Sequence, residues 1–125
     1  MATNNCRERV ILQQSKMMIL YNVTVNINPE VHDEWVAWMK EVHIPEVMQT
    51  GMFLENRFCR IHGFEEGGFS YSIQYLAPDM PTYDRYQAEF APSLQAAHQS
   101  KYQGKFAAFR TILEVIHIET PPAKA

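Results

Sequence analysis

The chain has 125 residues, of which 46% are hydrophobic and 20% charged, and its formal net charge is −3. This length fits one domain, and the residue balance is that of a globular protein rather than a disordered one. A weakly acidic chain lacks the positive field that binds phosphate backbones, so we expect no nucleic-acid partner. The sequence has no apolar run near the roughly 18 residues that a membrane span requires, so we expect no membrane partner.

The two ends of the chain are expected to lie outside the folded domain. The first 16 residues are polar, have little apolar periodicity and lack the apolar segment of a signal peptide. We therefore predict a disordered or loosely ordered extension over residues 1–17, with Met17 or Met18 as alternative natural starts. The predicted domain covers residues 18–118, and residues 119–125, which contain two adjacent prolines, form a loose tail.

The two cysteines, Cys6 and Cys59, are far apart in the sequence and form no spaced pair. Nothing in the sequence indicates a secretory context, in which a disulfide would be expected. We therefore predict two reduced thiols in a cytoplasmic protein.

Four segments have the pattern of β-strands. Residues 19–27 and 69–76 alternate between apolar and polar side chains, which is the period of a half-buried strand. Residues 52–61 and 106–118 complete the set. In the last strand the expected core-facing residues are Phe109, Thr111, Leu113 and Val115.

Two segments between these strands have helical signals. Asn28 and Pro29 start the first, as a cap and a first helical residue, and its apolar stripe falls at Val31, Trp35, Trp38, Met39 and Val42. Pro45 is expected to interrupt this helix before a short turn that Gly51 closes. The second runs from about residue 81 to residue 100, with Asp79 as its cap and a kink at Pro92.

The element order is therefore β-α-β-β-α-β, which predicts an α+β, ferredoxin-like fold with a four-stranded antiparallel sheet. Right-handed crossovers place both helices on one face and leave the other face bare. The expected bare face combines polar and aliphatic side chains: Leu20, Asn22, Thr24, Asn26, Ser70, Ser72, Gln74, Leu76, Arg110, Ile112 and Glu114. A second copy that covers this face would give a homodimer of the dimeric α/β-barrel type; a solvated sheet is the alternative.

The stretch from Ile19 to Ile116 resembles a bacterial family of small proteins classed as a domain of unknown function. The resemblance is carried by five short stretches: Ile19-Leu20-Tyr21-Asn22-Val23-Thr24-Val25, Trp35-Val36-Ala37-Trp38-Met39-Lys40, His43-Ile44-Pro45-Glu46-Val47 with Gly51 and Phe53, Gly104-Lys105-Phe106, and Phe109-Arg110-Thr111. This resemblance implies a domain but no activity.

A looser similarity comes from His43-x-Pro45, shortly before Gly51. It is similar to dimeric α/β-barrel proteins such as muconolactone isomerases, ethyl-tert-butyl-ether-degradation-type proteins and antibiotic-biosynthesis monooxygenases. That similarity implies a barrel dimer with a pocket between sheet and helices. The chemistries of these proteins vary, so the fold alone does not choose among them.

His43 is the first candidate for chemistry. It follows Trp35 by eight residues and Met39 by four, so a continuous helix places it on the apolar stripe, just before Pro45. A histidine there would serve as a proton shuttle or a ligand contact, or else as a core-edge residue bonded to a free carbonyl. His98 lies on the stripe of the second helix and would share a pocket with His43. The five histidines lack zinc-site spacing, so we expect neither a metal nor a cofactor.

The other candidates would contact a ligand. Trp35, Trp38 and Tyr83 belong to aromatic stripes that form either core or the wall of a pocket for a flat, apolar ligand. Asn22 and Tyr75 would orient that ligand, and Asn22 would otherwise belong to a dimer seam. The sequence thus predicts a small-molecule-binding or interaction domain without its own catalysis. The alternative is a cofactor-free enzyme, isomerase-like or monooxygenase-like, that uses His43 on an aromatic or polyketide-like molecule.

Overall fold

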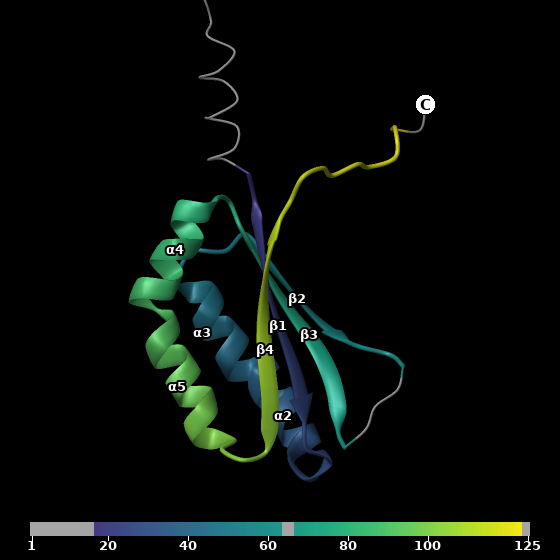
Figure 1. Ribbon diagram of the computed structural model, residues 1–125, viewed down its shortest axis with the longest axis vertical. Coiled ribbons are helices and arrows are strands. Elements are labelled where there is room, and N and C mark those ends of the chain that lie inside the picture. Colours follow the sequence, from purple (N-terminus) through teal and green to yellow (C-terminus); the bar gives the residue numbers. More distant parts are fainter. Residues whose placement is uncertain (1–16, 64–66, 124–125) are drawn as a thin grey trace, which may run out of the picture.

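The computed structural model describes residues 17–63 and 67–123, where one antiparallel sheet carries all the described helices on one of its faces (Figure 1). The strands are β1 Ile19–Ile27, β2 Glu55–Arg60, β3 Phe69–Ala77 and β4 Phe106–Glu114. Their order in the sheet is β2-β3-β1-β4. With one helical segment after β1 and another after β3, this is the predicted ferredoxin-like α+β fold.

The first helical segment starts where the sequence predicts. The side-chain oxygen of Asn28 accepts a hydrogen bond of 2.8 Å from the Glu30 amide, and Pro29 is the first helical residue. The segment consists of four consecutive pieces: η1 Pro29–Val31, α2 His32–Trp38, η2 Met39–His43 and α3 Ile44–Gln49. Pro45 therefore does not break the helix, because a π-helical turn, η2, precedes it. Gly51 has a φ of 77° and closes the segment as expected.

The second helical segment is divided at Pro92, as predicted. Helix α4, Met80–Glu89, starts at Asp79, whose carboxylate accepts a hydrogen bond of 2.8 Å from the Thr82 amide. Helix α5, Ala91–Lys101, then begins, with Pro92 in its first turn. Amides of the first turn have no partner within the helix, so the missing amide hydrogen of Pro92 costs no helical hydrogen bond. No helix in the described residues is long and apolar enough to cross a membrane.

The core lies between the helices and the face of the sheet that they cover. Trp35 is fully buried, and Val47 from α3 is 1% exposed. The central strands contribute alternate residues to this core, and the buried ones are Ile19, Tyr21, Val25, Ile27, Tyr71, Ile73, Tyr75 and Ala77. The period-two pattern of β1 and β3 therefore predicts their faces correctly.

The expected face of β4 is wrong. In the antiparallel register Arg110 lies opposite Val23, and Ala108 lies opposite Val25, so both share the face that the helices cover. Phe109 lies opposite Thr24, on the bare face. The assignment fails because β4 is an edge strand with apolar residues on both faces, so alternation alone does not show which face is covered.

The bare face combines apolar side chains with a network of hydrogen bonds. Phe109 is 63% exposed and Leu113 is 43% exposed. Asn22 accepts a hydrogen bond of 2.5 Å from the Ser72 hydroxyl and donates one of 3.1 Å to Thr24. This face also carries the exposed, free thiol of Cys59. Cys6 and residues 1–16 of the extension predicted over residues 1–17 lie outside the described residues.

Candidate functional site

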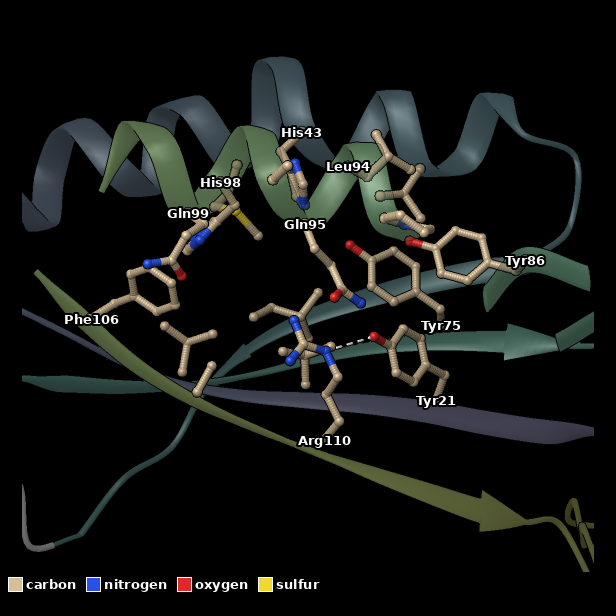
Figure 2. A pocket seen from close by; sticks show the side chains of 18 residues that line it. Tyr21, His43, Tyr75, Tyr86, Leu94, Gln95, His98, Gln99, Phe106 and Arg110 are labelled. Carbon is tan, nitrogen blue, oxygen red and sulfur yellow. Dashed lines mark hydrogen bonds between the residues drawn. The ribbon is translucent and has the colours of Figure 1, made fainter. Parts of the chain in front are cut away.

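A cavity of about 550 Å³ lies between the helices and the helix-covered face of the sheet. Side chains from α5, from the segment around His43 and from the sheet point toward one another across it (Figure 2). Its lining is Tyr21, Val23, Val25, Met39, His43, Val47, Ile73, Tyr75, Tyr86, Pro92, Leu94, Gln95, Ala96, His98, Gln99, Phe106, Ala108 and Arg110. The volume falls in the range of about 300–1,000 Å³ that is usual for small-molecule sites.

His43 reaches the cavity from the last residue of the π-helical turn. The amide of Ile44 donates to the carbonyl of Met39, five residues back, which is the pattern of a π-turn. The turn ends two residues before Pro45, which has no amide hydrogen to continue an α-helical ladder. Such turns often occur at functional sites, and this one places Met39, His43 and Val47 together on the cavity wall.

The imidazole of His43 stacks on an indole ring. Its ring lies 4.9 Å from the Trp38 ring, centroid to centroid, with an angle of 23° between the planes. Its Nδ1 atom is buried and has no hydrogen-bond partner among the described residues. Burial lowers the pKa of His43 to about 4, so the ring is neutral at pH 7. A neutral imidazole has one nitrogen able to accept a proton or a hydrogen bond.

His98 is fixed by a buried contact with Trp35. The indole Nε1 of Trp35 donates a hydrogen bond of 2.9 Å to Nε2 of His98. Because an indole nitrogen only donates, Nε2 of His98 is the acceptor and its Nδ1 carries the proton. Burial, with smaller contributions from electrostatic interactions with His43 and Arg110, lowers the pKa of His98 to about 4. The rings of His43 and His98 lie 5.7 Å apart, so the cavity holds two neutral imidazoles side by side.

Three tyrosines form the wall opposite the histidines. The rings of Tyr21 and Tyr75 lie 6.0 Å apart, and Tyr86 also lies 6.0 Å from Tyr21. Burial, together with the neighbouring tyrosines, raises the pKa of Tyr75 and of Tyr86 above the usual range. These hydroxyls therefore remain protonated and act as neutral hydrogen-bond donors.

Arg110 enters the cavity from β4. Its Nε atom donates a hydrogen bond of 2.9 Å to the hydroxyl of Tyr21, which Figure 2 marks with a dashed line. The alternation of β4 predicts Arg110 on the bare face, so the sequence alone misses it as a cavity residue. The β1–β4 register, which pairs Arg110 with Val23, would be needed to place Arg110 on the helix-covered face.

The structure divides the predicted site residues into two groups. His43, His98 and Tyr75 line the cavity. Trp35 and Trp38 lie behind the two histidines, and Tyr83 packs against Tyr21 with ring centroids 5.3 Å apart, so these three do not line it. Asn22 is on the bare face of the sheet, where it belongs to the hydrogen-bond network described above. Among residues 17–63 and 67–123, no three or more histidine, cysteine or acidic side chains gather as a metal site.

The fold and the cavity define a ferredoxin-like α+β protein with a pocket between its helices and its sheet. Residues 18–116 match the family described as a domain of unknown function, DUF4286, and the chain belongs to that family. No curated protein matches the sequence.

Solved structures share the fold at low sequence identity. A dimeric ferredoxin-like protein from an uncultured marine organism has a TM-score of 0.62 and 12% identity, over 82% of this chain and 99% of that one. A conserved protein of unknown function from Bacteroides thetaiotaomicron, described as a possible oxidoreductase, has a TM-score of 0.60 and 12% identity, over 80% of this chain and 99% of that one. SnoaB, a cofactor-independent oxygenase from Streptomyces nogalater that was solved as a mutant, has a TM-score of 0.59 and 8% identity, over 81% of this chain and 95% of that one. At these identities the comparisons establish the fold and not the activity.

Proposed function

We propose that this protein binds a small, flat and largely apolar molecule in the cavity between its helices and its sheet. The observation that carries the proposal is the open volume of about 550 Å³ beside His43. If the region between helices and sheet were only a packed core, the side chains of the aromatic stripes would fill it. Instead the space is open, and its lining does not include Trp35, Trp38, Tyr83 or Phe90. We also propose a cytoplasmic location, where an exposed thiol such as Cys59 stays reduced.

The composition of the wall supports a ligand that is mainly apolar with a few polar atoms. Aliphatic side chains such as Ile73 and Val47 and the rings of Tyr75 and Tyr86 supply the apolar surface. His43, His98 and the tyrosine hydroxyls supply neutral polar groups. A few polar groups on an apolar wall are typical of pockets that fix one orientation of a small molecule.

The alternative, a cofactor-free enzyme that uses His43, is not favoured over binding. A neutral histidine in an apolar cavity suits a general base, but it equally suits a hydrogen bond to a ligand. SnoaB is a cofactor-independent oxygenase of the same fold, and one fold supports many functions.

Blocking the cavity tests the binding proposal. Ala108 is on the cavity wall, so Ala108→Phe is expected to weaken binding of a neutral aromatic probe, 2-naphthamide, by at least about tenfold, because the new ring takes the space that the probe needs. Ala97→Phe is the matched control, since Ala97 is exposed on α5 and outside the lining. The measurement is a tryptophan-fluorescence titration. Equal affinity in wild type and Ala108→Phe would place the probe elsewhere and contradict the proposal.

We further propose that two copies pair through the bare face of the sheet. Phe109 and Leu113 expose apolar surface beside the polar network of Asn22 and Ser72, and exposure of such surface to water is unfavourable. The polar side chains already satisfy one another across the face, so a second copy would cover them with few unpaired groups. The dimeric ferredoxin-like protein of the same fold is consistent with this arrangement.

A charge on the bare face is expected to separate the dimer. Phe109→Asp places a carboxylate at the seam, where two copies would bury like charges without partners. The control is Leu54→Asp, because Leu54 is 61% exposed and Phe109 63%, and Leu54 directly precedes β2, at the edge of the sheet opposite β4. In sedimentation velocity at tens of micromolar, wild type and Leu54→Asp should run as dimers and Phe109→Asp as a monomer. A monomeric wild type would refute the pairing.

A further inference from the structure

Arg110 is the one cation among the described residues that line the cavity, and that lining contains no carboxylate. Among the ion pairs of residues 17–63 and 67–123, none involves Arg110. A cavity with an unpaired guanidinium therefore carries a net positive charge that its own walls leave uncompensated. Charge complementarity of this kind selects an anionic ligand.

The contact with Tyr21 determines which part of the guanidinium is available. Nε of Arg110 is engaged with the Tyr21 hydroxyl at 2.9 Å, and this bond anchors the side chain. Its two terminal nitrogens have no hydrogen-bond partner among the described residues. A guanidinium with both terminal nitrogens available matches the two oxygens of a carboxylate in a planar, bidentate pair.

The charge of Arg110 also acts on the interior of the cavity. Together with burial and His43, it contributes to lowering the pKa of His98. Arg110 itself is exposed, whereas Tyr75 is 3% and Ile73 is 2% exposed. The cavity therefore has a charged end at β4 and an apolar, aromatic interior.

We infer that the ligand is an aromatic carboxylate whose anionic group pairs with Arg110 while its rings lie between the tyrosines and the two histidines. This inference rests on the proposed binding function and adds the chemical class of the ligand. Neutral His43 and His98 would line the buried end of the ligand without competing for its charge. Arg110 would thus determine specificity.

Three probes that share the naphthalene ring separate the effect of charge from that of the ring: 2-naphthoate, neutral 2-naphthamide and cationic 2-naphthylmethylammonium, each titrated calorimetrically at pH 7.5. Wild type is expected to bind the carboxylate at least about tenfold more tightly than the amide, and the cation most weakly. In Arg110→Gln the preference for carboxylate over amide should fall below about twofold, while amide affinity is unchanged. Arg85→Gln is the matched control, since Arg85 is an exposed arginine of α4 outside the cavity lining. It should behave as wild type.

The outcomes distinguish the two proposals. Equal affinity for carboxylate and amide in wild type, with binding still lost in Ala108→Phe, would overturn the carboxylate inference and leave the binding function intact. A preference for carboxylate that survives in Arg110→Gln would also overturn it. Failure of all three probes to bind would contradict the binding function and, with it, the inference. Circular dichroism checks that Arg110→Gln remains folded.

Discussion

Replacing Trp35 with alanine is expected to lower the free energy of unfolding by about 3–5 kcal/mol, a large share of the stability of a small domain. Trp35 is fully buried, and its ring packs against Phe58 and Tyr71 at centroid distances of 5.5 and 5.2 Å. The substitution removes this packing and also the hydrogen bond to His98. Urea unfolding followed by far-ultraviolet circular dichroism measures the change.

A second variant separates the hydrogen bond from the packing. Trp35→Phe keeps an aromatic ring but removes the indole N–H, so Nε2 of His98 loses its donor in a buried setting, at a cost of about 1–3 kcal/mol. Trp38→Phe is the control, because Trp38 is only partly buried and contacts His98 through its ring at 5.8 Å. If Trp35→Phe proves no less stable than Trp38→Phe, the Trp35–His98 bond does not stabilise the fold as argued.

Acidification is expected to destabilise the protein between about pH 6.5 and pH 4. Burial lowers the pKa of His43 and of His98 to about 4, against an ordinary value of 6.5. In this window the unfolded chain binds protons that the folded chain does not, so stability falls as the pH falls. For each histidine the loss approaches roughly 3 kcal/mol at the acid end, and above pH 6.5 neither contributes.

Two variants test whether the cavity histidines cause this pH dependence. His43→Gln removes one titrating group, so its free energy of unfolding should change less than that of wild type between pH 7 and pH 5. His117→Gln, at an exposed histidine near the C-terminus, should follow wild type. Hydrogen bonds from Thr82 lower the pKa of Asp79 below its ordinary value of 3.8. The stability that Asp79 contributes is therefore lost only below about pH 3.8, outside the range from pH 7 to pH 5. Parallel curves for His43→Gln and wild type would contradict the burial argument.

The elements whose local signals are strong could be predicted from the sequence. The caps Asn28 and Asp79 and the division at Pro92 follow from local hydrogen bonding and proline geometry, and the structure confirms all three. The faces of β1 and β3 follow from alternation, because one face is buried and the other polar. His43, His98 and Tyr75 reach the cavity from elements of this kind.

What depends on pairing between distant segments could not be predicted in the same way. The face of β4 is set by its register with β1, so alternation alone predicts the wrong face for Arg110. Asn22 follows the correct alternation of β1, but that alternation places it on the bare face, away from the cavity. The π-helical turn at Met39–His43 has no composition signal of its own, since it depends on how the helix reaches Pro45 while packing on the sheet.

The central claim is that the cavity beside His43 binds a small aromatic molecule. The most direct test of this claim is to measure the nitrogen resonances of the histidine side chains. A long-range proton–nitrogen spectrum at pH 7 should show His43 and His98 as neutral rings, with His98 protonated on Nδ1. Added 2-naphthoate should shift the resonances of His43 and His98 and leave those of His117 unchanged. Cavity histidines that are charged at pH 7, or that do not respond to saturating probe, would contradict the account.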